Sequence, residues 1–176
     1  MRIFNEKEIT YKGKPYNVIE KRDAVAILLS IIDSETKRIA GFHFVRQFRP
    51  AINKSILEVP AGTIEENELP NVCAIRELRE ETGIKEINED FLHSLGAVYS
   101  SPGFSNEKIH LFVYSIYDFQ YAERGELSGD DKDEIKGMFV PLTDIYMDNV
   151  RFEDGKTMLL VNTYLSNLKD EYLGID

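Results

Sequence analysis

The sequence predicts an α+β protein, in which helices pack on a mixed β-sheet. Segments with strand character outnumber helical ones, and most of them follow one another without a helical crossover, which is typical of this class. Apolar residues recur at helical spacing in two longer segments, 69–82 and about 155–172. We therefore expect a sheet core sandwiched by these helices, preceded by an N-terminal β-hairpin.

The strands are expected in a regular order along the chain. Residues 1–20 form an extension of two short strands around the turn Lys12-Gly13-Lys14, which could pack on a partner subunit as easily as on its own chain. The main domain, residues 21–176, opens with the apolar run AVAILLSII, which is too short to span a bilayer and is typical of a buried strand. Further strands are expected at 38–49, 55–59, 92–100, 108–118 and 135–140.

Two helices and a shorter helical turn complete the expected elements. The helix at 69–82 is expected to end at Gly83, because glycine favours the left-handed conformation that closes many helices. A short helical turn is expected near LTDIYM, at 142–147. The final helix is expected to present one apolar face to the core: Met158, Leu159, Val161, Leu165 and Leu168.

Composition excludes several classes of function. The chain has 176 residues, 43% of them hydrophobic and 30% charged, which fits one soluble globular domain. Its 31 acidic and 21 basic side chains give a net charge of −10, which disfavours nucleic acid or an anionic membrane as a partner. The single Cys73 excludes an intrachain disulfide and fits a reducing cytoplasm. The polar start, MRIFNEKEIT, is not a secretory signal.

The helix at 69–82 carries three crowded glutamates. At ~100° per residue, Glu77, Glu80 and Glu81 fall within a sector of about 100°, and apolar residues lie opposite them (Ala74, Ile75 and Leu78). One interpretation is a solvated face in which Arg76 and Glu80 form an i,i+4 pair. The other is a site for hard divalent cations, which take carboxylate and phosphate oxygens together and would remove the repulsion between the glutamates.

The spacing around these glutamates favours the second interpretation. The fixed positions are Gly62, then five residues, Glu68, seven residues, Arg76-Glu77-Leu78, one residue, Glu80-Glu81, one residue and Gly83-Ile84. At every fixed position this run resembles the Nudix box, the signature of hydrolases that act on nucleoside diphosphates linked to another moiety. The resemblance extends over roughly residues 20 to 170.

The resemblance implies a loop–helix–loop that binds Mg²⁺, or Mn²⁺ in its place. It implies that Glu77 and Glu81 ligate the metal, with Glu80 as a further ligand or a catalytic neighbour and the backbone carbonyl of Ala61 as an additional ligand. It also implies that Glu68 and Arg76 brace the loop through an ion pair.

The flanking segments resemble the ADP-ribose pyrophosphatase and nucleoside diphosphate sugar hydrolase branch of this family. They are VRQFRPA at 45–51, LEVPAG at 57–62, SPGFSNE at 101–107 and DGKTMLLVNTYL near the end. A proline at the position of Pro102 is associated with ADP-ribose substrates. We expect Arg49, with Arg46 as a second candidate, to bind the diphosphate, because a guanidinium fork suits paired oxygens. Glu107 is a candidate contact with substrate or metal. Strand-end charges and a tight turn are the alternative interpretations of these residues.

In this branch a carboxylate outside the box activates water or completes the metal site, and the resemblance implies that it lies in the acidic segment AERGELSGDDKDE, at 122–134. Side-chain reach favours Glu134 and alignment favours Asp133, with Asp131 and Glu126 as further possibilities. His43 and His110 lie within expected strands and are interpreted as packed residues. The aromatic residue that would stack on a nucleobase is left open among Phe4, Tyr11, Tyr16, Phe48 and Phe104.

The resemblance therefore implies Mg²⁺-dependent hydrolysis of ADP-ribose to AMP and ribose 5-phosphate. An alternative is another nucleoside diphosphate sugar, such as a UDP- or GDP-hexose. An alternative of another class is a non-catalytic sensor that binds ADP-ribose, which the intact box disfavours. Members of this branch are commonly homodimers, and residues 1–20 suit a contact between two subunits.

Overall fold

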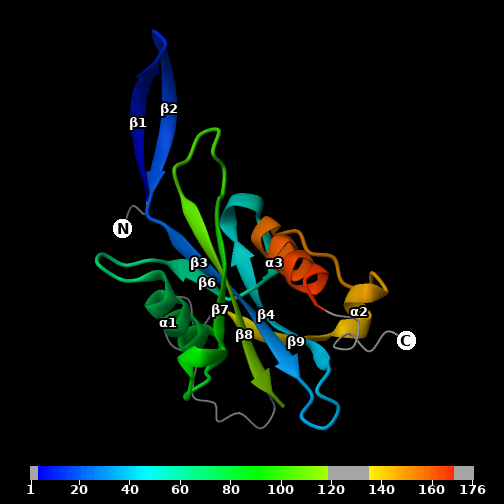
Figure 1. The fold of residues 1–176 in the computed structure, drawn as a ribbon. Coiled ribbons are helices and arrows are strands. Elements are labelled where there is room, and N and C mark those ends of the chain that lie inside the picture. The colour runs from blue at the N-terminus through cyan, green and yellow to red at the C-terminus, as the bar shows by residue number, and fades with distance from the viewer. Residues whose placement is uncertain (1–3, 119–134, 169–176) are drawn as a thin grey trace.

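The protein is built around one mixed seven-stranded sheet with a helix on each face, as the sequence predicts (Figure 1). The computed structural model describes residues 4–118 and 135–168. The strands are β1 (Phe4–Tyr11), β2 (Lys14–Lys21), β3 (Ala24–Ile32), β4 (Ile39–Arg49), β5 (Lys54–Glu58), β6 (Ala61–Thr63), β7 (Leu92–Tyr99), β8 (Lys108–Tyr117) and β9 (Lys136–Pro141). The helices are α1 (Pro70–Thr82), α2 (Leu142–Tyr146) and α3 (Gly155–Ser166), with short 3₁₀ turns at Pro50–Ile52 and Glu89–Phe91.

The central strand β3 divides its pairing between two neighbours. The strand order of the sheet is β5-β4-β3-β8-β7, with β6 paired to β3 and β9 paired to β4. On one side β3 runs parallel to β8 along its whole length. On the other side Ala24–Ala26 pairs with β6, whereas Leu29–Ile32 pairs with β4. The backbone N–H of Ile27, between these two parts, donates to the carbonyl of Pro60 at 2.9 Å. This division holds the chain that leads from β5 into β6 beside the middle of the sheet.

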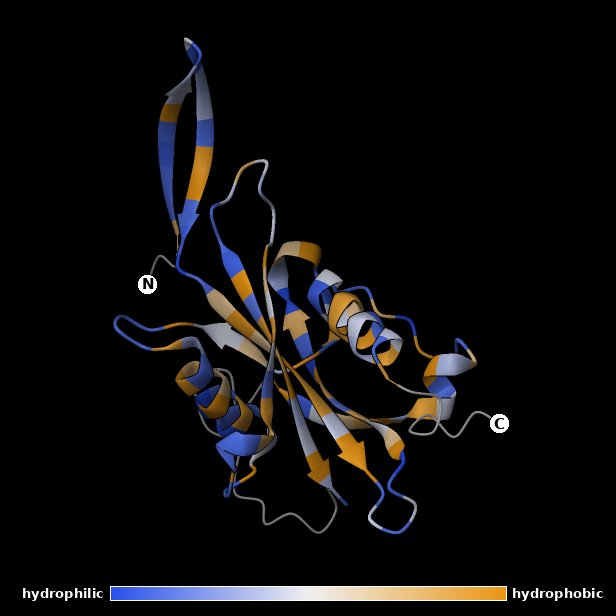
Figure 2. Cartoon of the chain, viewed as in Figure 1, coloured by the Kyte–Doolittle hydropathy of each residue, from blue (hydrophilic) through white to orange (hydrophobic). Residues whose placement is uncertain are grey.

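The two faces of the sheet form two cores, because successive strand side chains point to opposite sides. Ala26 and Leu28 of β3 pack in a cluster with Leu160 and Val161 of α3. The alternate residues of β3 pack against α1 in a second cluster: Val25, Ile27, Leu29, Cys73, Ala74 and Leu78. Figure 2 shows hydrophobic residues along the central strands, between α1 and α3. Both helices are therefore fixed by apolar burial on the sheet.

The boundaries of α1 agree with the local signals in the sequence. Pro70 occupies the first turn, where a missing N–H does no harm, and Gly83 closes the helix at φ 72° while its N–H donates to Arg79 O at 3.0 Å. Helix α3 is capped by Asp154, whose side chain accepts from the Thr157 N–H.

The buried face of α3 differs from the prediction. Met158 and Leu159 are exposed, whereas Leu160 and Val161 are buried, and Tyr164 and Leu165 continue that face. The reason is the helical period: the buried face follows steps of three and four residues through Thr157, Leu160, Val161, Tyr164 and Leu165, and Met158 and Leu159 lie outside it.

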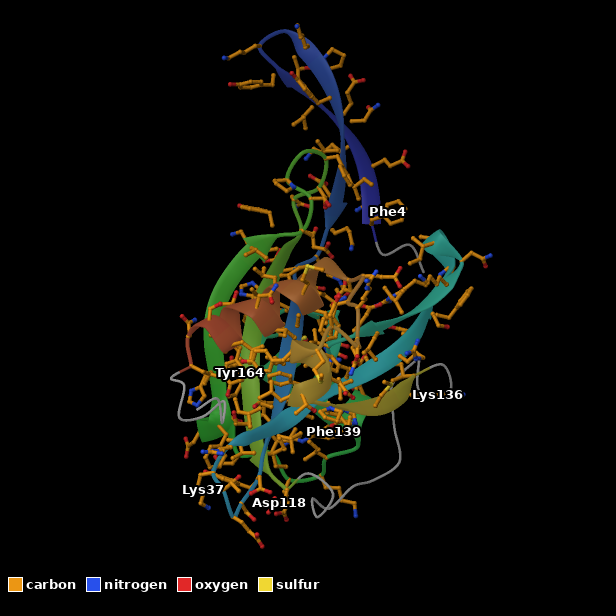
Figure 3. The ribbon with its side chains drawn as sticks, turned by 90° about the vertical axis from the view of Figure 1, so that its right-hand side faces the viewer. Phe4, Lys37, Asp118, Lys136, Phe139 and Tyr164 are labelled. Carbon is orange, nitrogen blue, oxygen red and sulfur yellow. The ribbon has the colours of Figure 1, made fainter. Side chains whose placement is uncertain are left out.

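The hairpin of β1 and β2 projects from the sheet (Figure 1). Lys12 and Gly13 have φ values of 50° and 74°, the pair of positive angles that a two-residue type I′ turn requires. Every residue of β1 is exposed. Figure 3 places Phe4 at the hairpin end of the molecule and Lys37 and Asp118 at the opposite end.

None of the helices in residues 4–118 and 135–168 has both the length and the apolar character to cross a bilayer.

Candidate active site

The glutamate face of α1 lies against β6. Glu77 and Glu81 are 8% and 7% exposed, although both carry carboxylates. The backbone N–H of Ala61 donates to Glu81 Oε2 at 3.1 Å, and the carboxylate of Glu77 fills the space beside Gly62 where any other residue would carry its Cβ. The strand β6, which the sequence did not predict as an element, therefore positions two of the predicted ligands.

Arg76 connects this face to the preceding loop. Its Nε and Nη2 donate to the two carboxylate oxygens of Glu68 at 2.9 and 3.0 Å, which confirms the predicted ion pair. Its Nη2 also donates to Thr63 O at 3.2 Å. Its Nη1 donates to Glu77 Oε1 at 2.6 Å and to Glu80 Oε2 at 3.3 Å. Arg76 thus braces the loop and partly neutralises the glutamates from one side.

Burial makes the charged state of two glutamates unfavourable. Burial, and then the neighbouring charge of Glu77, raises the pKa of Glu81 to about 8. Burial likewise raises the pKa of Glu77, although Arg76 opposes this effect. Glu80 is more accessible, with 27% of its side chain exposed. Two adjacent buried carboxylates are a costly arrangement unless protons or cations compensate them.

The donors fit a hard divalent cation. Carboxylate oxygens of Glu77 and Glu81 and the carbonyl of Ala61 are the ligands that such a cation prefers, and Gly62 leaves them room. In the part of the chain that the structure describes, no three carboxylate, histidine or cysteine side chains are already gathered as a metal cage. The hydrogen bonds of Arg76 hold Glu77 and Glu80 in the arrangement seen here.

A second charged cluster lies at the end of β4. Arg49 donates from Nε to Glu58 Oε1 at 2.5 Å and from Nη2 to Glu58 Oε2 at 2.7 Å. Lys156 of α3 also donates to Oε2 of this carboxylate, which is 2% exposed. Sequence reasoning named Arg49 but missed Glu58 and Lys156. The available signal was an acidic residue between Leu57 and Val59, in a strand that is otherwise apolar.

The other predicted substrate residues lie on β4 and in the turn between β7 and β8. Arg46 is exposed on β4, and Pro102 is exposed in a turn closed by the Ser105 N–H, which donates to Ser101 O at 2.9 Å. Glu107 accepts from Lys21 Nζ at 2.5 Å and from Ser100 Oγ at 2.7 Å. The structure therefore pairs Glu107 with the base of the hairpin.

The remaining candidates fall into three groups. The base candidates Glu126, Asp131, Asp133 and Glu134 lie outside the described residues. All of the aromatic candidates are exposed: Phe4, Tyr11, Tyr16, Phe48 and Phe104. His43 is buried in β4, and His110 Nε2 lies 3.4 Å from Asp23 Oδ2.

Cys73 lies on the buried side of α1, where α1 meets β6. Its Sγ accepts from Arg76 Nη2 at 3.2 Å and lies 3.7 Å from Thr63 O, to which it donates. Burial raises the pKa of this thiol to about 12. It therefore has the environment of a packed structural thiol.

Comparison with known proteins agrees with the geometry of the box. The NUDIX domain matches residues 20–161. The chain is similar to a methanol dehydrogenase activator of Bacillus methanolicus, with 34% identity over 84% of this chain and 77% of the relative. It is 35% identical to an ADP-ribose pyrophosphatase of Bacillus subtilis and 36% identical to a GDP-mannose pyrophosphatase of Citrobacter koseri. These two alignments cover 70% and 67% of this chain but span only 62% and 63% of the relatives.

A solved structure shares the fold. A crystal structure of an ADP compounds hydrolase superposes with a TM-score of 0.66 at 18% identity, covering 94% of this chain and 88% of that one. The matched domain includes the whole loop and helix from Gly62 to Ile84, with its buried glutamates and its Glu68–Arg76 pair. The chain belongs to the NUDIX family.

Proposed function

We propose that this protein is a Mg²⁺-dependent pyrophosphohydrolase that cleaves ADP-ribose to AMP and ribose 5-phosphate. The proposal rests on two buried carboxylates beside β6. Glu81 accepts a hydrogen bond from the Ala61 N–H, and Glu77 lies against Gly62. The B. subtilis ADP-ribose pyrophosphatase, at 35% identity, supports the choice of substrate.

Three groups from β6 and α1 would hold the cation: Glu77, Glu81 and the carbonyl of Ala61. When bound, Mg²⁺ or Mn²⁺ neutralises diphosphate charge and acidifies a bound water. Glu80, the more accessible glutamate, would be a further ligand or would accept a proton from the attacking water, a role for which Asp133 and Glu134 are also candidates.

The remaining roles concern the substrate. Arg49 would hold the diphosphate oxygens in line for attack, with Arg46 as a second cation. Pro102 would shape the turn that meets the adenosine or ribose, and Glu107 would contact the substrate from the same turn. Nucleic acid and membrane have no part in this proposal.

The test is a direct assay. Purified protein with Mg²⁺ and ADP-ribose should release AMP and ribose 5-phosphate, and Glu81→Gln should lose about 10²-fold or more of kcat while remaining folded. Glu66→Gln, in the exposed part of the same loop, is the matched control and should keep full activity. A folded Glu81→Gln variant with wild-type activity would contradict the metal assignment. Titration with Mg²⁺ and Mn²⁺ identifies the preferred cation.

A second substrate has its own support. The GDP-mannose pyrophosphatases match this chain at about the same identity as the ADP-ribose enzyme does, for example 36% for the C. koseri protein. Comparing kcat/KM for ADP-ribose, GDP-mannose and a UDP-hexose decides between them. If ADP-ribose binds but none of these compounds is cleaved, the protein is a sensor.

We also propose that the hairpin mediates homodimerisation. Ile9 and Tyr16 are cross-strand partners, so they share one hairpin face with Tyr11, and all three are exposed. An isolated two-stranded hairpin is marginally stable in water, which favours its burial on a second subunit. Sedimentation at micromolar concentration should show a dimer that Tyr16→Lys weakens, whereas Thr10→Lys on the opposite face should not. A wild-type monomer would contradict this. A cytoplasmic location is part of the proposal and is supported by the lone Cys73.

A further inference from the structure

The cluster around Glu58 joins three elements that are distant in the sequence. Arg49 ends β4, Glu58 ends β5, and Lys156 lies in the first turn of α3, 98 residues after Glu58. Glu58 is 2% exposed and uses both carboxylate oxygens for these two cations. Asp154 also contacts Lys156, at 3.0 Å, so the cluster pairs two cations with two carboxylates and fixes Arg49 within a network of ion pairs.

Among the described residues, only Glu58 accepts hydrogen bonds from the Arg49 side chain, which leaves part of the guanidinium available. The edge formed by Nε and Nη2 is bound to Glu58 in the bidentate manner that fixes the plane of the group. The hydrogens of Nη1 and the second hydrogen of Nη2 point away from that edge, because a guanidinium carries its N–H groups in a rigid planar fork. The side chain is 39% exposed, so these donors are accessible to an anion.

Lys156 is itself held in place on α3. Its side chain is 15% exposed, and its Nζ lies 3.0 Å from Asp154 Oδ1 in addition to its contact with Glu58. The other oxygen of Asp154 accepts from the N–H and the hydroxyl of Thr157 at 2.9 and 2.6 Å. The Val59 N–H, next to Glu58, donates to the Thr157 hydroxyl at 2.9 Å. The first turn of α3 thus binds both Glu58 and the backbone that leads to Ala61.

The cluster also lies within electrostatic reach of the glutamates on α1. The hydrogen bonds to Glu58 raise the pKa of Arg49, and the charges of Asp154 and Glu81 add to this effect. Although burial opposes it, hydrogen bonding to Arg49 and the charge of Lys156 lower the pKa of Glu58. The carboxylate of Glu58 therefore stays charged and keeps its hold on both cations.

We propose that Glu58 and Lys156 are positioning residues, which together fix the guanidinium of Arg49 so that its free N–H groups face the substrate diphosphate. Lys156 acts through Glu58: it fixes one carboxylate oxygen from the side of α3, and the carboxylate in turn fixes the guanidinium plane. This inference rests on the proposed function, since it assigns to Arg49 the binding of a diphosphate.

The experiment compares substrate affinity with turnover. We expect Lys156→Met to raise the KM for ADP-ribose about tenfold and to leave kcat within about twofold, because a misaligned guanidinium binds a diphosphate less well. The Kd for ADP, measured by calorimetry in EDTA, should rise by a similar factor. Lys156→Arg should restore both values to within about threefold, because it keeps the charge and the donor.

The matched control is Lys54→Met. Lys54 pairs with Glu153 at 2.6 Å, so it also joins β5 to the segment before α3, but it makes no contact with Glu58. Its removal should change neither KM nor the Kd for ADP. Lys156→Gln is the second variant if Lys156→Met folds poorly, because it retains an N–H donor for Glu58 without the charge, and it should give an intermediate rise in KM.

A double-mutant cycle tests whether Lys156 acts through Arg49. In an Arg49→Lys background, Lys156→Met should add less than about twofold to KM and to the Kd for ADP. Independent, multiplicative effects would show that Lys156 contacts the ligand directly, and unchanged KM and Kd in either folded Lys156 variant would show that the cluster is only structural. Both results overturn the proposal. Failure of the proposed function is distinct, because the wild type would then leave ADP-ribose intact, and the Kd for ADP would still test the coupling.

Discussion

A Cβ atom on residue 62 would stand 1.8 Å from Oε1 of Glu77, so this loop accepts only glycine while the glutamate keeps its position. The contact joins β6 to α1 across the candidate metal site. It gives the glycine of the box a role in packing, since Gly62 is not among the glycines with positive φ.

Gly62→Ala should therefore displace Glu77 and lower kcat by about 10²-fold, with a higher Mg²⁺ concentration needed for half-maximal activity. Steady-state assays across a Mg²⁺ titration measure both changes. Gly155→Ala is the control, because a Cβ at residue 155 meets nothing within 4 Å. Normal metal dependence in Gly62→Ala would show that Glu77 is not a ligand.

Cation affinity should depend on pH through Glu81. Its pKa is raised to about 8, so at neutral pH a proton must leave before the carboxylate can bind a cation. The apparent affinity for Mg²⁺ should rise as the pH increases from about 6.5 to about 8 and level off above that value. Calorimetric titration at several pH values measures it. Glu81→Gln should bind weakly with a flatter profile, and an affinity that falls with pH would contradict the assignment.

Acid stability should depend on Glu68. Hydrogen bonding to Arg76 lowers the pKa of Glu68 from 4.5 to about 2. A lowered folded-state pKa stabilises the protein above pH 4.5, and this stabilisation is lost as the pH falls through the interval down to about 2. Glu68→Gln should lower the free energy of unfolding by only about 1 kcal/mol at neutral pH, because the ion pair borders solvent. The difference between the variant and the wild type should vanish near pH 2. Urea unfolding at several pH values measures it, with Glu66→Gln as the control. An equal loss of stability at neutral pH and near pH 2 would show that the ionised Glu68 does not stabilise the fold.

The stability of the hairpin should depend more on the ion pair between Lys21 and Glu107 than on the pair between Lys7 and Glu20. Lys21 binds Glu107 of the neighbouring turn at 2.5 Å with 13% of the glutamate side chain exposed, whereas Lys7 and Glu20 form a pair within the hairpin that is 54% and 41% exposed. Lys21→Met should lower the free energy of unfolding by about 1 kcal/mol, and Lys7→Met should lower it by less than about 0.5 kcal/mol. Urea unfolding and amide exchange in β2 compare the two variants. Equal effects would show that the hairpin is not anchored through Glu107.

Local signals account for what the sequence predicted well. The turn at Gly13 and the glycine end of α1 depend on residues close in the chain and follow from short-range backbone preferences. The Glu68–Arg76 pair was expected from the family resemblance instead.

Contacts between residues distant in the sequence could not be predicted from local signals. The bond between Glu58 and Lys156 spans 98 residues, and only the packing of α3 on the sheet brings the two together. Strand β6 has three residues and exists because β3 divides its pairing, which no local pattern reveals. The prediction that Met158 and Leu159 face the core was wrong, because the packing of α3 on the sheet turns Leu160 and Val161 inward.

The burial of Cys73 allows its thiol to report when α1 detaches from the sheet. The chain contains one cysteine, and it is fully buried between α1 and the sheet with a pKa of about 12. A thiol reagent can therefore modify the native protein only when α1 detaches, because the thiol is buried and its raised pKa leaves little of it as thiolate. The labelling rate measures how often the glutamate helix leaves the sheet, without any engineered probe. Slower labelling on addition of a divalent cation would give the free energy by which that cation clamps the helix in place.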